Sequence, residues 1–124
     1  MLFRSLDELG AGTDPREGAG LAVSILEHLH ALGALVICTT HHNDLKAFAS
    51  GYDGAMNAAM EFDPRTLQPT YRILQGLPGR SCALEISERL GLPAAVLSRA
   101  RELLGTAHFE VEDLLASQIG RAHV

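Results

Sequence analysis

Apolar and polar positions follow different patterns in successive segments of this chain of 124 residues. Between Pro15 and Leu32 the apolar residues recur with helical spacing, which predicts an amphipathic helix. Asp14 is placed to cap its start, Pro15 suits its first turn, and Gly33 suits its end. The next run, Ala34–Thr39, is continuously apolar and rich in β-branched residues, which predicts a strand covered on both faces.

A further strand is predicted to end at Leu6, because Gly10 and Gly12 then provide a turn into the helix. The order strand, helix, strand predicts a right-handed crossover and therefore a parallel sheet. Thr40–Asp44 then lies at the carboxyl edge of that sheet, where open α/β sheets bind their ligands. A short helix over Asp44–Ala49 is predicted to follow.

The second half of the chain predicts a β-hairpin and then a helical hairpin. Ala55–Phe62 and Thr70–Leu74 have strand patterns on either side of a turn-rich connection. The apolar spacing of 82–90 and of 96–104 predicts two helices joined by a short turn that contains glycine and proline. Glu110–Gln118 predicts the first turns of another helix.

Composition narrows the function classes. The formal net charge is -5 and the charges of both signs are mixed along the chain, so no basic surface for nucleic acid is indicated. Cys38 and Cys82 have no paired spacing, which predicts buried thiols in a reducing compartment. No apolar run approaches the ~20 residues of a membrane span. We therefore expect a cytoplasmic protein without membrane contact.

The two ends of the chain differ from the rest. Arg4 and Ser5 do not fit a buried strand, because an unpaired buried charge is costly. Residues 1–5 and 119–124 can both be back-translated into the ends of common sequencing adapters. We therefore expect these residues to be adapter-derived, a kind of segment to exclude from fold reasoning. Ordinary polar ends are the open alternative, and the underlying codons decide between the two.

Asp7 and Glu8 form the strongest chemical signal, because they follow a predicted strand and precede a glycine turn. A carboxylate at a strand end holds Mg²⁺ in P-loop nucleotidases, usually through water, because the ion keeps part of its hydration shell. Asp7 suits that role. A second acid just beyond it can polarise the attacking water, which suits Glu8. The alternative is an acidic pair that is simply solvated in a loop.

Gly79-Arg80-Ser81 offers a second candidate, because a glycine turn that opens a helix presents backbone amides to anions. The plainer interpretation, which we favour, is a loop with Ser81 capping the helix and Arg80 solvated.

Several motifs together resemble one known family, the ATPase domain of the MutS superfamily. The Gly-Ala-Gly-Thr-Asp-Pro form of the loop is similar to the MutS2 branch rather than to mismatch-repair MutS. The segments that carry the resemblance are Leu6–Pro15, Glu17–Ala19, Thr39–His41, Pro69–Arg72, Gly76–Ser81 and Arg99–Leu104.

The resemblance implies that Asp7 and Glu8 are the Walker B pair, with Asp7 holding Mg²⁺ through water and Glu8 catalytic. It makes His41 the catalytic switch histidine that faces the γ-phosphate, which suits a histidine at the sheet's carboxyl edge. The loop that follows Glu8 would cross a dimer interface to sense the other subunit's nucleotide. That loop comprises Gly10, Ala11, Gly12, Thr13 and Asp14.

Other histidines fit a site less well. His42, next to His41, is the alternative candidate for the switch histidine. His28 and His30 are two positions apart on the predicted helix and do not share a face, so a zinc site is not favoured.

The resemblance also implies the fold class: α/β, with part of the parallel sheet of an ABC-type, MutS-like P-loop NTPase, a β-hairpin and a C-terminal helical hairpin. It divides the chain into an ATPase half over residues 6–80, a dimerising helical hairpin over 81–105 and the start of a further helix over 106–118. The apolar stripes of the hairpin fit an internal core equally well, and this alternative stays open. ATP and Mg²⁺ are the implied cofactors, and a homodimer is the implied assembly.

The parent protein would hydrolyse ATP, bind branched or mismatched DNA and suppress homologous recombination, or act on ribosomes as proposed for some family members. DNA or ribosome contacts and nuclease activity would reside in other domains, and no nuclease residue is assigned in this chain.

No Gly-x-x-x-x-Gly-Lys-Ser/Thr phosphate loop occurs in the sequence. We therefore expect the chain alone to bind ATP poorly and to be inactive as an ATPase. Two alternatives stay open: a segment of another ABC- or SMC-like ATPase, and a non-catalytic dimerisation module.

Overall fold

The computed structural model describes residues 1–105, in two compact units that divide after Asp53. Each unit is built from elements that are near one another in the sequence. The helix predicted at Glu110–Gln118 lies outside the described residues. None of the helices in the described part has the length and hydropathy of a membrane span.

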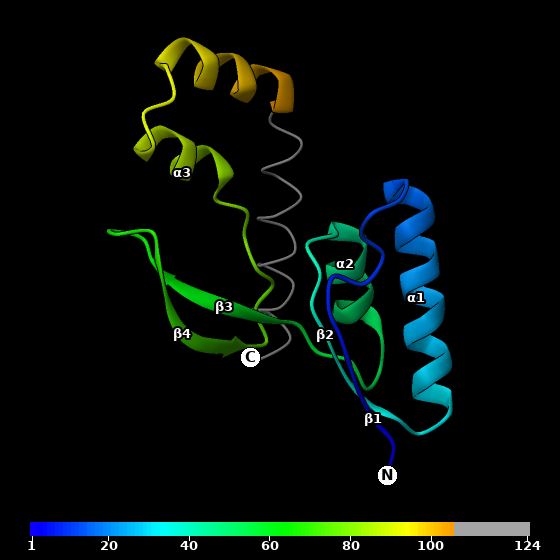
Figure 1. The fold of residues 1–124 in the computed structure, drawn as a ribbon. Helices are drawn as coiled ribbons and strands as arrows, with labels where there is room; N and C mark the ends of the chain where they lie inside the picture. Colours follow the sequence, from blue (N-terminus) through cyan, green and yellow to red (C-terminus); the bar gives the residue numbers. More distant parts are fainter. Residues whose placement is uncertain (106–124) are drawn as a thin grey trace. The chain divides into compact units, whose positions relative to one another are not determined.

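The first unit is a βαβα arrangement (Figure 1). It consists of β1 (Phe3–Leu6), α1 (Pro15–Ala31), β2 (Leu35–Cys38) and α2 (Asn43–Gly51). β1 and β2 pair in parallel, with Leu6 opposite Cys38, and α1 packs against both β2 and α2. The predicted parallel pair, with the long helix as its crossover, is confirmed.

Local signals set the ends of α1. The Asp14 carboxylate accepts a hydrogen bond from the Glu17 amide at 3.0 Å, and Pro15 occupies the first turn. Gly33 has a φ of 77°, a left-handed conformation that suits the residue after a helix. The predicted cap, start and end of this helix are confirmed.

The prediction that the second strand is covered on both faces is wrong for this unit. Leu35 is 56% exposed and Ile37 is 60% exposed, whereas the alternate residues Val36 and Cys38 are half-buried. Within the unit the strand is packed against α1, so that only one set of alternating side chains is covered. Few apolar residues of the unit are buried, namely Ala19, Ala22 and Leu45.

Arg4 and Ser5 lie within β1 and are exposed, and the Arg4 guanidinium donates a hydrogen bond to the Phe3 carbonyl at 2.8 Å. No buried charge therefore arises from Arg4 in this strand. The adapter origin of residues 1–5 and 119–124 stays a prediction.

The second unit begins with the predicted β-hairpin. β3 (Ala58–Asp63) and β4 (Gln68–Gln75) pair antiparallel, with an irregularity between Met60 and Phe62. The connection closes through a hydrogen bond of 2.7 Å from the Leu67 amide to the Asp63 carbonyl. The hairpin is confirmed, with β3 starting three residues later than predicted and β4 extending further at both ends.

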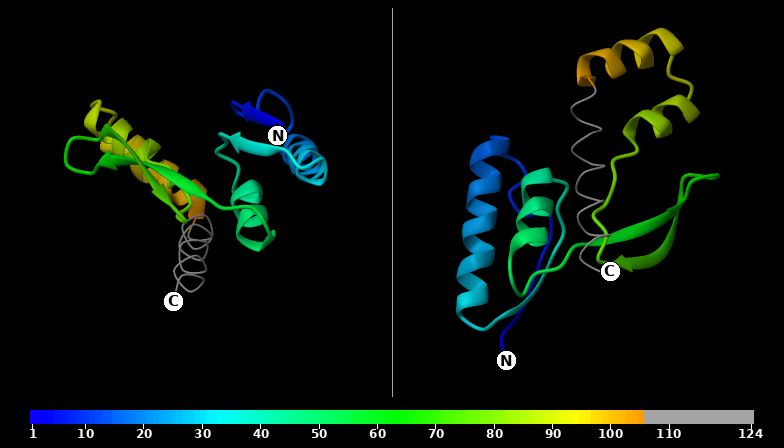
Figure 2. Two further views of the ribbon diagram at one scale, coloured as in Figure 1. Left: turned by 90° about the horizontal axis from the view of Figure 1, so that it is seen from below. Right: turned by 180° about the vertical axis from the view of Figure 1, so that it is seen from behind.

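The predicted helical hairpin is also present in the second unit. α3 (Ala83–Arg89) is followed by a helix over residues 94–105, and Figure 2 shows the two joined by a short turn. The turn uses Gly91 at a φ of 93°. Arg101 Nη2 lies 3.7 Å from Glu88 Oε2, which links the two helices. Cys82, rather than the predicted Ser81, occupies the N-cap position of α3.

Candidate active site

The acidic pair lies directly beyond the end of β1. Because Leu6 pairs with Cys38, the next residues of the two strands, Asp7 and Thr39, also come together. The Thr39 hydroxyl donates a hydrogen bond to Asp7 Oδ1 at 2.5 Å. Asp7 is thus fixed at the carboxyl edge of the parallel pair, where ligands bind in open α/β sheets.

Glu8 has an unusual backbone conformation for a residue with a side chain. Its φ is 49°, in the left-handed region that non-glycine residues rarely adopt. Its amide donates to Thr39 Oγ1 at 2.9 Å, and the Leu9 amide donates to the Thr39 carbonyl at 3.1 Å. The chain therefore turns sharply just after Asp7, and the Glu8 side chain is exposed.

The glycine loop that follows is packed onto the first turns of α1. Gly10 has a φ of 85°, and a Cβ placed on it would lie 2.6 Å from the carbonyl oxygen of Gly18. Gly12 is also left-handed, with a φ of 82° and open space around it. Most of the loop is exposed, and Asp14 at its end caps α1. The structure thus gives Gly10 and Asp14 structural roles beside the interface role that the resemblance implies. The exposed loop residues are Ala11, Gly12, Thr13 and Asp14.

Two neighbouring histidines follow β2 at the same edge of the sheet. The rings of His41 and His42 are stacked, with centroids 5.0 Å apart and an interplanar angle of 20°. His41 is exposed, whereas His42 is half-buried and occupies the N-cap position of α2. The His42 amide donates a hydrogen bond to Thr40 Oγ1 at 3.1 Å. The His42 Nε2 atom is buried and has no hydrogen-bond partner in the described part of the chain. Of the two, His41 is therefore the ring that is accessible to a ligand.

His30 has a packing role on α1. Its Nδ1 lies 3.0 Å from the hydroxyl of Tyr52, and the two rings meet edge to face at 5.2 Å. Tyr52 also contacts Phe48 of α2, at 4.7 Å between ring centroids. These contacts join the end of α1 to the end of α2.

Cys38 lies at the end of β2, next to the site. Burial raises the pKa of the Cys38 thiol above its ordinary value, and a backbone hydrogen bond involving Leu9 offsets part of that rise. The thiol also donates a weak hydrogen bond of 3.6 Å to the Thr39 carbonyl. Cys38 and Cys82 are both half-buried rather than buried as predicted.

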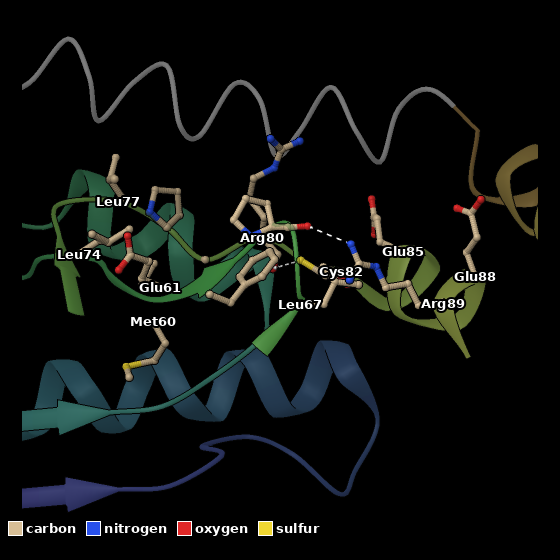
Figure 3. A pocket seen from close by; sticks show the side chains of 16 residues that line it. Met60, Glu61, Leu67, Leu74, Leu77, Arg80, Cys82, Glu85, Glu88 and Arg89 are labelled. Atoms are coloured by element: carbon tan, nitrogen blue, oxygen red, sulfur yellow. Dashed lines mark hydrogen bonds between the residues drawn. The ribbon is translucent and has the colours of Figure 1, made fainter. Parts of the chain in front are cut away.

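The second unit contains a hollow of about 1070 Å³ between its β-hairpin and α3 (Figure 3). Its lining is mixed, with apolar side chains such as Met60 and Leu77 beside charged ones such as Glu85 and Arg80. Arg89 Nη2 lies 3.5 Å from the Pro64 carbonyl and so links α3 to the hairpin turn. Gly79, Arg80 and Ser81 line this hollow. α3 has only seven residues, which weakens the phosphate-anchor interpretation of this turn.

The sequence did not single out Thr39 as a site residue. Its hydroxyl contacts the two acidic residues 31 and 32 positions away. Thr39 could have been found by aligning the ends of the two predicted strands. A hydroxyl residue just past the end of one strand then lies beside the acid just past the end of its parallel neighbour.

The residues at this edge fit magnesium. Asp7 and Glu8 are exposed carboxylates, and Mg²⁺ prefers oxygen ligands, keeps several waters and takes one or two carboxylates together with substrate phosphates. Within residues 1–105 no three His, Cys, Asp or Glu side chains gather into a metal-binding group. The donor set thus suits an ion shared with a phosphate ligand better than a closed structural site.

Comparison with known proteins decides the family. The sequence model described as MutS domain V matches residues 3–108. The chain belongs to the MutS domain V family. The resemblance to MutS proteins drawn from the sequence motifs is thus confirmed.

The chain is also similar to curated proteins named Endonuclease MutS2. It is 60% identical over 111 residues to that of Thermomicrobium roseum and 52% identical to that of Staphylococcus saprophyticus. The one from Staphylococcus aureus strain bovine RF122 is 50% identical. Each match covers 90% of this chain and 14% of the relative, so the chain spans a small part of the proteins it matches. The MutS2 branch predicted from the loop sequence is confirmed by these matches.

Proposed function

We propose that Asp7, Glu8 and His41 form the magnesium- and water-organising half of an ATPase site in a MutS2-type protein. The observation that carries the proposal is their common position: Asp7 and Glu8 follow β1, and His41 follows the parallel strand β2 at the same edge. In this proposal the parallel pair is part of a larger P-loop NTPase sheet, and ATP and Mg²⁺ are the cofactors.

The residues divide the work by their chemistry. Bound Mg²⁺ would supply charge neutralisation and orientation for the β- and γ-phosphates. Asp7 would hold a water of the ion with its carboxylate, which the Thr39 hydroxyl keeps in place. Glu8 takes a proton from the attacking water, since its exposed carboxylate can act as a general base. His41 donates a hydrogen bond to a phosphate oxygen, which its exposed ring allows.

A second subunit completes this proposed assembly. The loop over Gly10–Asp14, which is exposed from Ala11 onward, faces the nucleotide of the partner subunit, and the helical hairpin of residues 81–105 contributes to the dimer contact. Leu90 is 83% exposed and Leu103 is 69% exposed, so the hairpin carries apolar surface that a partner can cover. A non-catalytic dimerisation module is the alternative that this surface favours.

The proposed parent is a cytoplasmic homodimer that uses ATP hydrolysis to change how its other domains hold branched or mismatched DNA. Suppression of recombination and a ribosomal role belong to the same proposal. The relatives' name, Endonuclease MutS2, supports a nuclease activity in that parent, and no residue of this chain is assigned to it.

The test uses an exchanged protein, in which residues 6–105 of this chain replace the aligned segment of the Thermomicrobium roseum relative. Glu8→Gln should lower steady-state ATP turnover by about 10²–10⁴-fold, the range for loss of a general base, and leave ATP binding intact. Glu27→Gln, on the exposed side of α1, is the matched control and should have no effect. Unchanged turnover in Glu8→Gln would show that Glu8 is not the base.

The isolated chain provides a second test. Because its sequence has no phosphate loop, it should show no tight magnesium-dependent ATP binding in calorimetry. Tight binding would contradict the proposal that this chain carries only half of the site.

A further inference from the structure

The side chain of Thr39 forms hydrogen bonds to both acidic residues. Its hydroxyl donates to Asp7 Oδ1 at 2.5 Å and accepts from the Glu8 amide at 2.9 Å. We infer that Thr39 is a positioning residue that sets the magnesium affinity of the site by fixing the Asp7 carboxylate and the turn at Glu8. The inference rests on the proposed function of the acidic pair.

The backbone at Glu8 shows why such a residue is needed. A φ of 49° is unfavourable for glutamate and persists only where the surroundings hold it. Thr39 bonds the Glu8 amide with its hydroxyl and the Leu9 amide with its carbonyl, at 2.9 and 3.1 Å. Thr39 is itself tied to β1, because its amide donates to the Leu6 carbonyl at 2.9 Å. Thr39, which directly follows β2, thus fixes the backbone from Leu6 to Leu9.

The side chain of threonine is suited to this double contact. A hydroxyl donates one hydrogen bond and accepts others, so it can serve a carboxylate and an amide at once. The branched Cβ restricts χ1, which keeps the hydroxyl in one direction. With one oxygen of Asp7 held by Thr39, the carboxylate would be preoriented to hold a water of a bound Mg²⁺ ion.

Thr39→Val tests the inference, because valine has nearly the same shape and lacks the hydroxyl. In the exchanged protein we expect the dissociation constant of Mg²⁺, measured by calorimetric titration with a non-hydrolysable ATP analogue, to rise by about 10–100-fold, the usual effect of losing a second-shell partner. The free Mg²⁺ concentration for half-maximal ATP turnover should rise by a similar factor. The KM for ATP at saturating Mg²⁺ should change little. Thr39→Ser keeps both hydrogen bonds and should restore most of the magnesium affinity.

Thr70→Val is the matched control. Thr70 Oγ1 also donates to a carboxylate, Glu61 Oε2, at 2.8 Å, but in the β-hairpin of the second unit. It should leave the magnesium requirement unchanged. If Thr39→Val does not fold, Thr39→Ala also removes the hydroxyl without adding bulk and should show the same rise.

The outcomes separate the two proposals. If Thr39→Val and Thr39→Ala keep the wild-type magnesium requirement while Glu8→Gln still abolishes turnover, the role of Thr39 is wrong and the proposed function stands. If Glu8→Gln has no effect, the proposed function itself fails. A rise in the magnesium requirement that Thr39→Ser reverses, with Glu8→Gln inactive, supports both.

Discussion

Gly10 and Gly18 approach each other so closely that neither can carry a side chain. A Cβ on Gly10 would lie 2.6 Å from the Gly18 carbonyl oxygen, a separation that real Cβ contacts essentially never show. The loop after the acidic pair therefore packs directly against the backbone of α1 at Gly18. This contact connects the start of α1 to the turn that carries Asp7 and Glu8.

Gly18→Ala should destabilise the protein although the residue is helical. Glycine to alanine in a helix usually stabilises by about 0.5–1 kcal/mol, but added bulk in a tight contact costs about 1–3 kcal/mol. Gly20→Ala, on the same helix with no atom within 4 Å of its Cβ position, is the control and should stabilise. The free energy of unfolding of the full chain in urea, followed by circular dichroism, measures both. A gain in stability for Gly18→Ala would contradict the close packing.

The thiol of Cys38 should react more slowly in the folded chain than in the unfolded chain. Burial raises its pKa, so the folded state keeps this proton to higher pH than the unfolded state does. The contribution of this thiol to the free energy of unfolding is therefore fully present below the ordinary pKa of the thiol. It is lost as the pH rises through the raised pKa of the folded state. In a Cys82→Ser background, iodoacetamide should modify Cys38 more slowly at pH 8.5 without urea than with it. Equal rates would show that Cys38 is not protected.

The exposed leucines of the helical hairpin should support self-association. Leu103 is 69% exposed on the helix over residues 94–105, and glutamate there would place a charge in the proposed dimer contact. We expect Leu103→Glu to lower the dimer fraction of the exchanged protein by about tenfold or more, as measured by light scattering across a dilution series. Ser98→Glu, an exposed position on the same helix, is the control. An unchanged mass for Leu103→Glu would place the dimer contact elsewhere.

Local sequence signals predicted the elements well where the physical cause is itself local. Asp14, Pro15 and Gly33 act on the backbone within a few residues of their own position, and these residues mark the ends of α1 in the structure. The same holds for the turn between β3 and β4 and for the glycine turn between α3 and the following helix. Hydrogen bonding and allowed φ values at these positions depend little on the rest of the fold.

Burial and long-range contacts were harder to predict from the sequence. The continuous apolar run of β2 predicted cover on both faces, but exposure depends on which elements pack there, and Leu35 and Ile37 are open in this unit. Likewise, the exposed position of His41 and the half-buried position of His42 follow from how α2 begins, since the two residues have the same side chain.

By itself, the sequence determined the order of the elements, the ends of α1, the acidic pair and the MutS domain V family, because these depend on short-range patterns and motifs. Only the tertiary structure decided that Thr39 joins Asp7 to Glu8 and that Gly10 rests on Gly18. The Thr39 contacts span more than 30 positions and depend on the register of a parallel strand pair. That register is a property of the strand pair and not of either strand alone, so it becomes visible only when β1 and β2 are seen side by side.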